Sequence, residues 1–497
     1  MVYWLAGGES NYEEDCIAND NTEGVELWGN CYSIQNTTEL LLGDSGLSGE
    51  IPTKIGSLIN LTDLELYNNQ LNGQIPSEIS NLSNLTIFNV HNNDLSGTLP
   101  EEIWTLTNLN SLNLSNNNFI GGISSQIINL QSLTYLNLHK NQLAGEFPLE
   151  IYQLDNLTFL DLSHNELNGI ISSDIANLDN LNLLDIRSNQ ISGIIPPEIG
   201  TLTNLIWLDM GTNQISGQIP SEIGNLSNLN HLNLWNNQLS GNIPAGIWDL
   251  VDLTRLDLDK NQLSGTIPPE IGNLINVETL WLSENQFSGI IPDEICQFVD
   301  DESFGITENN FCPPYPSCVE NYLGVQDASN CPPILEKIED YQIEEGNTLE
   351  LELSVTHSEI STLSYFVHSE NSNIEFTING ESILIAPSEN WNGTSLITVV
   401  VEDSNLQSDT SNFNLSVTPV NDKPIAMDDH FMVAEDDTLH GELHAEDGDY
   451  FPTQQEMQDL TYSITLSTLN GTLSVIDTSG AFTYTPDANF FGADSFL

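Results

Sequence analysis

Apolar residues recur along the first three-fifths of the chain with a period of 24 residues. Each unit has the form L-x-x-L-x-L-x-x-N, as at Leu61, Leu64, Leu66 and Asn69. Ten units follow one another without insertion, starting at Leu61, Leu85, Leu109, Leu133, Leu157, Leu181, Leu205, Leu229, Leu253 and Val277. A degenerate eleventh unit fits the same phase at Thr37. A fixed period of this length predicts a solenoid, in which each unit is stable only because it stacks on its neighbours.

The first half of each unit alternates apolar and polar residues, the period of two that a short strand requires. In the first full unit Leu64 and Leu66 are predicted to point inward, whereas Asp63 and Glu65 point outward. The Asn that follows must turn into the core, and a buried amide is tolerated only when it is hydrogen-bonded. We therefore predict a stack of asparagines bonded to the backbone of adjacent coils, at Asn69, Asn93, Asn117 and onward to Asn285.

The second half of the unit reads L-x-G-x-I-P-x-x-I-x-x-L-x-N. Residues 215–220, with the sequence I-S-G-Q-I-P, are one example of its first six positions. Its Gly permits a tight turn and its Pro stops a regular helix. The whole repeat resembles the plant-type leucine-rich repeat of receptor-like proteins, over about residues 25–300. The resemblance implies a curved solenoid with a parallel sheet on its concave face. Ser124 and Ser172 stand where the pattern has Pro, and we expect a looser convex side there.

The 24-residue period ends near two proline-rich segments, residues 312–316 and 331–333. Beyond them, short alternating strands separated by Asn, Gly, Ser and Asp predict β-sandwiches. Segments 390–394, 417–424 and 482–492 resemble bacterial cadherin-like or Ig-like tandem modules. The prediction is a mainly β chain, with a leucine-rich repeat solenoid of eleven repeats at 37–300 and sandwiches at 333–423 and 424–497. The last module looks incomplete, so we expect the sequence to be a fragment.

The resemblance to cadherin-like tandems implies calcium as a cofactor, because calcium lies at the module junctions of such proteins. Calcium takes six to eight oxygen ligands, largely carboxylates and carbonyls. The candidate ligands are Glu345, Asp403, Asn421, Asp422, Asp447 and Asp449. Where the first module should offer a D-x-D, the chain has Thr356-His357-Ser358, which argues against a site between solenoid and first module. The alternative is that these acids are ordinary turn residues.

The charge balance is strongly acidic, with 72 Asp and Glu against 7 Lys and Arg and a formal net charge of −65. Such a surface repels nucleic acids and anionic membranes, so neither is expected as a partner. It suits cations, or it is simply a well-solvated surface. No stretch reaches the roughly 18 apolar residues of a transmembrane helix, so we expect no transmembrane segment in this chain.

Six cysteines lie at the two ends of the array, two before it and four at its far end and beyond. This placement predicts disulfide-bonded caps at 1–36 and 301–332 and an extracellular or cell-surface location. No other cysteine is close in sequence to Cys16 and Cys31, which predicts that these two pair. The remaining four allow three pairings, and zinc binding is a further alternative for them: Cys296, Cys312, Cys318 and Cys331.

Two short motifs suggest chemistry but are better explained by the fold. Gly43-Asp44-Ser45-Gly46 matches the serine motif of trypsin-like proteases, yet Ser45 falls on the asparagine position of the first repeat. His440 and His444 would share a metal only on a helix, and their surroundings predict a strand. The sequence therefore predicts a protein that is not an enzyme.

The side chains at the outward positions of the concave strands are not needed in the hydrophobic core, and several of them are aromatic or acidic. Exposed aromatics on a sheet often mark recognition surfaces. The predicted ligand-binding residues are Tyr135, Phe159, Asp161, Asp185, Trp207, Asp209, His231, Trp235 and Trp281. Aromatic rings would stack on apolar ligand faces, and carboxylates would take amines or hydroxyls.

Three hypotheses follow for the function. The first is an extracellular binding or adhesion protein that recognises a protein, peptide or glycan on the concave face, with calcium-stiffened sandwiches as a stalk. The second is the non-catalytic recognition arm of a larger secreted enzyme whose catalytic domain lies outside this sequence. The third is a structural spacer without a ligand.

Overall fold

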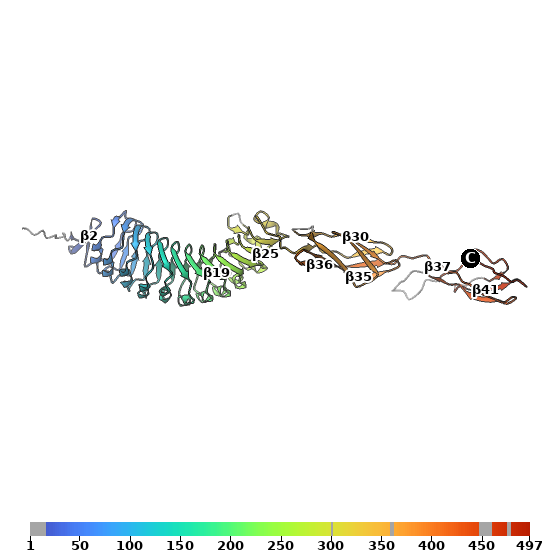
Figure 1. The fold of residues 1–497 in the computed structure, drawn as a ribbon. Coiled ribbons are helices and arrows are strands. Elements are labelled where there is room, and N and C mark those ends of the chain that lie inside the picture. Colours follow the sequence, from blue (N-terminus) through green and yellow to red (C-terminus); the bar gives the residue numbers. More distant parts are fainter. Residues whose placement is uncertain (1–15, 300–301, 358–361, 447–459, 475–478) are drawn as a thin grey trace, which may run out of the picture. The chain divides into compact units, whose positions relative to one another are not determined.

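The computed structural model describes residues 16–299, 302–357, 362–446, 460–474 and 479–497 (Figure 1). The chain divides into two compact units, Met1–Cys331 and Pro332–Leu497. All the named elements of the described residues are strands or short 3-10 helices. The mainly β architecture predicted from the sequence is therefore confirmed.

The first unit opens with a small antiparallel sheet of β1 (Cys16–Ile17), β2 (Glu23–Leu27) and β3 (Asn30–Ser33). A disulfide joins Cys16 to Cys31 across it, as predicted. Leu27 is fully buried and belongs to the same hydrophobic core as the solenoid leucines. The small sheet thus covers the apolar end that the first coil would otherwise expose.

The solenoid coils stack in a curved row (Figure 1), and their first strands form one parallel sheet, called here the concave sheet. Each strand pairs in register with the strand 24 residues later, for example Leu64 with Phe88. The strands are β4 (Glu39–Leu41), β6 (Asp63–Glu65), β8 (Ile87–Asn89), β10 (Ser111–Asn113), β12 (Tyr135–Asn137), β14 (Phe159–Asp161), β16 (Leu183–Asp185), β18 (Trp207–Asp209), β20 (His231–Asn233), β22 (Arg255–Asp257), β24 (Thr279–Trp281) and β26 (Phe304–Gly305).

A second parallel sheet, which the sequence analysis did not anticipate, runs through the L-x-G segments. Its Gly residues have positive φ, such as +83° at Gly193, so the strand bends where only glycine fits easily. The strands are β5 (Ser48–Glu50), β7 (Gln70–Gly73), β9 (Asp94–Thr98), β11 (Asn118–Gly121), β13 (Gln142–Glu146), β15 (Glu166–Ile170), β17 (Gln190–Gly193), β19 (Gln214–Gln218), β21 (Gln238–Asn242), β23 (Gln262–Gly265), β25 (Gln286–Ile290) and β27 (Asn310–Cys312).

A single 3-10 turn completes each coil, and Pro precedes most of these turns because it already holds the extended φ of the cap. The turns are η1 (Thr53–Ser57), η2 (Ser77–Asn81), η3 (Glu101–Thr105), η4 (Ser125–Asn129), η5 (Leu149–Gln153), η6 (Ser173–Asn177), η7 (Pro197–Thr201), η8 (Ser221–Asn225), η9 (Ala245–Asp249), η10 (Pro269–Asn273) and η11 (Asp293–Phe298).

The two coils that lack this Pro keep the same backbone. Ser124 has φ −68° and ψ 145°, close to the −69° and 143° of Pro100 in the preceding coil. The Ser124 and Ser172 hydroxyls accept hydrogen bonds from the backbone N–H groups of Gln126 and Asp174. The looser convex side expected there is not observed, since a side-chain cap replaces the proline.

The array continues one coil further than the sequence analysis placed it. We predicted eleven repeats ending at residue 300, but each parallel sheet contains twelve strands. Phe304 and Ile306 take the two inward positions of the extra coil, and Asn309 takes the asparagine position. The segment that was assigned to the cap therefore begins with a true coil.

The predicted asparagine ladder is present. The Asn165 side-chain oxygen accepts the N–H of Leu143 at 3.0 Å, and its amide donates to the carbonyls of Leu138 and Leu162, both at 3.0 Å. The same pattern recurs from Asn69 to Asn309. In the first coil the N–H of Ser45 donates to the Asn69 side chain, which agrees with a structural role for that serine.

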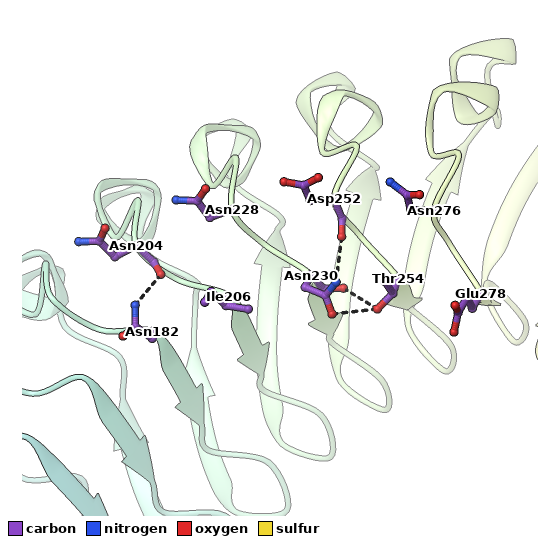
Figure 2. A pocket seen from close by; sticks show the side chains of 9 residues that line it. All are labelled: Asn182, Asn204, Ile206, Asn228, Asn230, Asp252, Thr254, Asn276 and Glu278. Carbon is purple, nitrogen blue, oxygen red and sulfur yellow. Dashed lines mark hydrogen bonds between the residues drawn. The ribbon is translucent and has the colours of Figure 1, made fainter.

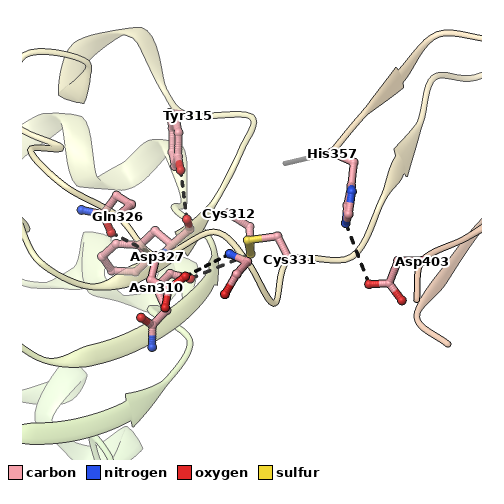
Figure 3. Close-up of a disulfide and its surroundings, with 10 residues drawn as sticks. Asn310, Cys312, Tyr315, Gln326, Asp327, Cys331, His357 and Asp403 are labelled. Atoms are coloured by element: carbon pink, nitrogen blue, oxygen red, sulfur yellow. Dashed lines mark hydrogen bonds and ion pairs between the residues drawn. A yellow bond between two sulfur atoms is a disulfide. The ribbon is translucent and has the colours of Figure 1, made fainter. Parts of the chain in front are cut away.

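Two crossed disulfides close the far end of the solenoid. Cys296 pairs with Cys318 and Cys312 pairs with Cys331, which settles the pairing left open. Because all four sulfur atoms are in disulfides, they are not zinc ligands. Around the second bridge, the Tyr315 hydroxyl donates to the Phe311 carbonyl at 3.0 Å (Figure 3). The short helix η12 (Ser317–Val319) buries Val319 in the solenoid core.

The second unit begins with a β-sandwich. One sheet contains β29 (Tyr341–Glu344), β36 (Ser408–Thr418), β35 (Gly393–Glu402) and β32 (Ser364–Ser369), and the other contains β30 (Leu349–Glu352), β34 (Ser382–Pro387) and β33 (Ile374–Asn379). Strands β28 (Ile334–Leu335) and β31 (Val355–Thr356) form a small extra pair. Alternate residues of both sheets, such as Ile385 and Val399, are fully buried and form the core.

A smaller set of strands follows in the same unit. Strands β38 (Leu439–Glu442), β41 (Ala481–Pro486) and β40 (Gly471–Leu473) form one sheet, and β37 (Ile425–Ala426) pairs with β39 (Ala445–Glu446). Phe482 and Tyr484 form the centre of its core. His440 lies in β38, as its alternating surroundings predicted. Within the part of the chain that the structure describes, no helix is both long and apolar enough to cross a bilayer.

The asparagine ladder yields a stability prediction. Replacing Asn165 with Ala should destabilise the solenoid by about 1–3 kcal/mol for each buried backbone group left unsatisfied. Seven of the eight tryptophans lie in the first unit, so tryptophan fluorescence in urea reports on this unit. The control is Asn242→Ala, which removes an exposed amide and should leave the urea midpoint within experimental error. Equal midpoints for both variants would contradict the role assigned to the ladder.

Candidate ligand-binding surface

The concave sheet carries a continuous row of apolar and aromatic side chains across five neighbouring strands. The row runs over the first position of strands β12 to β20 and consists of Tyr135, Phe159, Leu183, Trp207 and His231. All except His231 are partly exposed. At the usual spacing of parallel strands the row is about 19 Å long. Five in-register strands thus present one apolar strip on a surface that is not needed for the core.

Two pairs of rings in this row are stacked. The Tyr135 and Phe159 rings have their centroids 4.3 Å apart and an interplanar angle of 17°. The Trp207 and His231 rings have centroids 3.5 Å apart and are nearly parallel, at 5°. Because equal positions on paired parallel strands lie side by side, the repeat itself brings these rings together. Stacking fixes the rings in place before any ligand arrives.

An ion-pair cluster lies next to the second ring pair. Arg187 Nη1 lies 3.1 Å from Asp209 Oδ2, and Arg187 Nε lies 3.5 Å from Asp185 Oδ2. The Asp209 side chain is 0 % exposed and also accepts hydrogen bonds from the Asn233 amide and the Gly211 N–H. The sequence analysis predicted that Asp209 binds an amine or hydroxyl of the ligand, but the Asp209 side chain has no exposed surface. It holds Arg187 in place instead.

The two carboxylates of this cluster differ in protonation. Burial raises the pKa of Asp185 to about 8, and the nearby charges of Asp209 and Asp161 act in the same direction. Burial also acts to raise the pKa of Asp209, but His231, the Gly211 N–H and the Arg187 charge outweigh it and hold that pKa below its ordinary value. Near neutral pH, therefore, Arg187 has one charged partner, Asp209, and one mostly neutral neighbour.

The remaining predicted residues are distributed along the sheet. Asp161 accepts hydrogen bonds from the Ser163 N–H and hydroxyl, so it organises its own strand end. Trp235 is 36 % exposed, and the Lys260 ammonium lies 5.9 Å from its ring centroid. Trp281 lies over Gly305, where a Cβ atom would come within 2.5 Å of the indole. It lies two coils beyond His231, or about 10 Å, and at the third rather than the first position of its strand, so it does not belong to the strip.

Basic side chains near the strip were not recognised in the sequence. Of only seven Lys and Arg residues, four fall in the stretch 140–260: Lys140, Arg187, Arg255 and Lys260. Arg187 and Arg255 lie beside buried aspartates of the concave sheet, with Arg255 Nη2 2.8 Å from Asp257 Oδ2. The sequence contained a signal for these residues, because four of the seven basic side chains of a very acidic chain fall within one stretch of the repeats.

The predicted calcium ligands lie in several places. Glu345 Oε2 accepts the N–H of Val420 at 3.3 Å, which brings it beside Asn421 and Asp422. Asp403 is buried and accepts the N–H groups of Asn405 and Gln407. His357 Nε2 lies 3.9 Å from Asp403 Oδ2 (Figure 3). Asp447 and Asp449 lie outside the described residues. In the described part of the chain no cluster of three or more His, Cys, Asp or Glu side chains could hold a metal ion.

Comparison with known families matches the solenoid and the last module of the chain. Residues 107–167 and seven further segments between 60 and 298 match leucine-rich repeat families, and residues 421–497 match the bacterial Ig domain family. The chain carries leucine-rich repeats and a bacterial Ig domain. This agrees with the resemblances drawn from the L-x-x-L-x-L-x-x-N frame and from the strands after residue 417. No curated protein matches this leucine-rich repeat chain.

Solved structures similar to this leucine-rich repeat protein include plant receptors. One is the Arabidopsis receptor kinase HAESA in complex with the peptide hormone IDA and the co-receptor SERK1, at 36 % identity and a TM-score of 0.55 over 58 % of this chain and 48 % of that one. Another is the plant peptide hormone receptor RGFR1 in complex with RGF2, at 36 % identity and a TM-score of 0.45 over 57 % and 53 %. The chain thus spans about half the length of these structures.

The ion-pair cluster predicts a specific pH dependence of stability. Because the folded-state pKa of Asp185 is raised to about 8, its ionisation disfavours the folded state increasingly as pH rises from about 4 to about 8. Asp185→Asn keeps the acceptor for the Arg187 N–H but removes that ionisation. Its urea midpoint should exceed that of the natural chain, by more at pH 8 than at pH 5.

The matched control is Asp155→Asn, which changes an exposed acid two coils earlier. The urea midpoint of this variant should differ from that of the natural chain by the same amount at both pH values. The Asp185 carboxyl would not be the titrating group if the difference in urea midpoint between Asp185→Asn and the natural chain stayed constant or became smaller from pH 5 to pH 8.

Proposed function

We propose that the chain is a non-catalytic extracellular recognition protein that binds a peptide along the aromatic strip of its concave sheet. The observation that carries the proposal is the row from Tyr135 to His231, with two stacked ring pairs on five in-register strands. Rigid, partly exposed aromatics provide contact area at low entropic cost. The matched families describe repeats and an Ig domain rather than catalytic domains.

The charge pattern around the strip supports a peptide of mixed character. A chain with a net charge of −65 would repel acidic ligands from most of its surface. Near the strip, Arg187 and Lys140 offset Asp161 and Asp209, and the raised pKa of Asp185 leaves that carboxyl mostly neutral. The side chain of Arg187 is 36 % exposed, so its guanidinium can pair with a carboxylate of the ligand. The HAESA complex, which contains a peptide hormone, supports the same class of ligand.

Disulfides support the extracellular location. All six cysteines are paired, and disulfides form and persist mainly in oxidising compartments. Adhesion through the concave sheet and calcium between the Ig-type modules remain parts of the proposal, with Glu345, Asn421 and Asp422 as the first ligands to test. The Glu345 contact with Val420 favours this set. For calcium, the melting temperature of the full chain should rise when calcium replaces a chelator.

The peptide proposal is tested with a displayed random-peptide library selected on the full chain. The affinity of an enriched peptide, measured by calorimetry, should fall about ten-fold or more in Phe159→Ala, since a lost aromatic contact costs roughly 1.5–3 kcal/mol. Thr279→Ala is the control, because it changes the same strand position five coils away. Failure to enrich any peptide, or an unchanged affinity in Phe159→Ala, would contradict the assignment of the strip.

A further inference from the structure

A shallow groove of about 650 Å³ runs along the solenoid beside the beginnings of the concave strands (Figure 2). Five successive coils line it with two parallel rows of side chains at the 24-residue period. One row, just before the concave strands, consists of Asn182, Ile206, Asn230, Thr254 and Glu278. The other row consists of Asn204, Asn228, Asp252 and Asn276. None of these residues belongs to the aromatic strip of the concave sheet.

Hydrogen bonds to the backbone fix the amides of the groove. The Nδ2 groups of Asn204, Asn228 and Asn276 donate to backbone carbonyls of the preceding coil at 2.9, 2.8 and 2.8 Å. The amides of Asn182 and Asn230 donate to the carbonyls of Asn204 and Asp252, both at 3.0 Å (Figure 2). Each amide therefore has a set orientation. Asn182, Asn204, Asn228 and Asn276 retain a carbonyl oxygen and one N–H for another molecule, whereas the Asn230 oxygen already accepts the Thr254 hydroxyl at 2.9 Å (Figure 2).

The chemistry of the groove selects a neutral, hydroxyl-bearing ligand. Its lining contains amides, a hydroxyl and the carboxylates of Asp252 and Glu278, but no Lys, Arg or aromatic residue. Amide groups both donate to and accept from hydroxyls, while the carboxylates only accept and repel anions. Ile206 is 48 % exposed and offers one apolar contact in the second of the five coils. This combination disfavours nucleic acids and acidic polysaccharides.

The period of the groove distinguishes between two kinds of extended chain. Coils joined by parallel strands repeat about every 4.8 Å. A peptide strand advances about 3.3 Å per residue and presents the same face only every second residue, about 6.6 Å, so it drifts out of phase within two or three coils. A sugar ring with its glycosidic oxygen spans a length close to one coil. A linear glycan whose successive rings present the same face can thus meet equivalent groups on successive coils.

We propose that this groove binds a linear neutral polysaccharide of pyranose units, about one unit per coil, with its hydroxyls on the fixed amides. The inference does not depend on the peptide proposal, because it rests on a different set of residues. It adds to the chain a carbohydrate site beside the concave sheet.

The test uses the full chain and three neutral hexasaccharides, built from β-1,4-, β-1,3- and α-1,4-linked glucose, with polygalacturonate as the acidic comparison. We expect at least one hexasaccharide to bind in calorimetry, and more tightly than polygalacturonate. Asn228→Ala should weaken that binding about five-fold or more. Asn84→Ala is the matched control, since Asn84 makes the same bond to the preceding coil, to Ile59 at 3.0 Å, but does not line the groove.

Several outcomes would overturn the assignment. They are absence of binding by all three hexasaccharides, tighter binding of polygalacturonate, or equal losses in Asn228→Ala and Asn84→Ala. Phe159→Ala serves to separate the two surfaces and should leave hexasaccharide binding unchanged. If that variant alone abolishes it, the sugar lies on the aromatic strip and the groove proposal fails while a concave ligand site stands.

Discussion

One side-chain amide per coil controls the architecture of the first unit. Each ladder asparagine bonds at once to its own strand end and to backbone of the coil before it, as Asn165 does with Leu162, Leu143 and Leu138. These bonds satisfy polar groups that the leucine core would otherwise leave unpaired. Because each bond spans a constant number of residues, every coil must have the same length. Equal lengths in turn place equal positions of successive coils side by side.

That regularity decides what the surfaces can do. Tyr135 stacks on Phe159, and Trp207 on His231, only because their strands are in register. The amides of the lateral groove come from the same register, and Asn228 repeats there what Asn204 does one coil earlier. One surface combines rings with a few cations, and the other has amides and no cation. A single repeat thus generates two faces of different chemistry.

Local patterns in the sequence predicted the parts that depend on period. The leucine positions, the ladder, the Cys16–Cys31 bridge and the sandwich at 333–423 needed only alternation, spacing and turn residues. The second sheet was missed because the L-x-G segment is too short and polar to show alternation, and the twelfth coil because Phe304 and Ile306 replace leucines. The contact of Arg187 with Asp209 spans 22 residues across two coils, so it depends on side-chain reach that no pattern records. The pairing of the last four cysteines likewise depended on where the twelfth coil ended.

The placement of the disulfides at the two ends of the solenoid has a consequence for its evolution. All three bridges lie outside the run of identical coils between Leu61 and Asn285, and none ties one interior coil to another. A gene duplication or loss of one whole coil would therefore keep both sealed ends and every interior contact type intact, whereas loss of a single residue would break the phase. The length of the solenoid can therefore change in steps of one coil, and the length of each of its two faces changes by the same step.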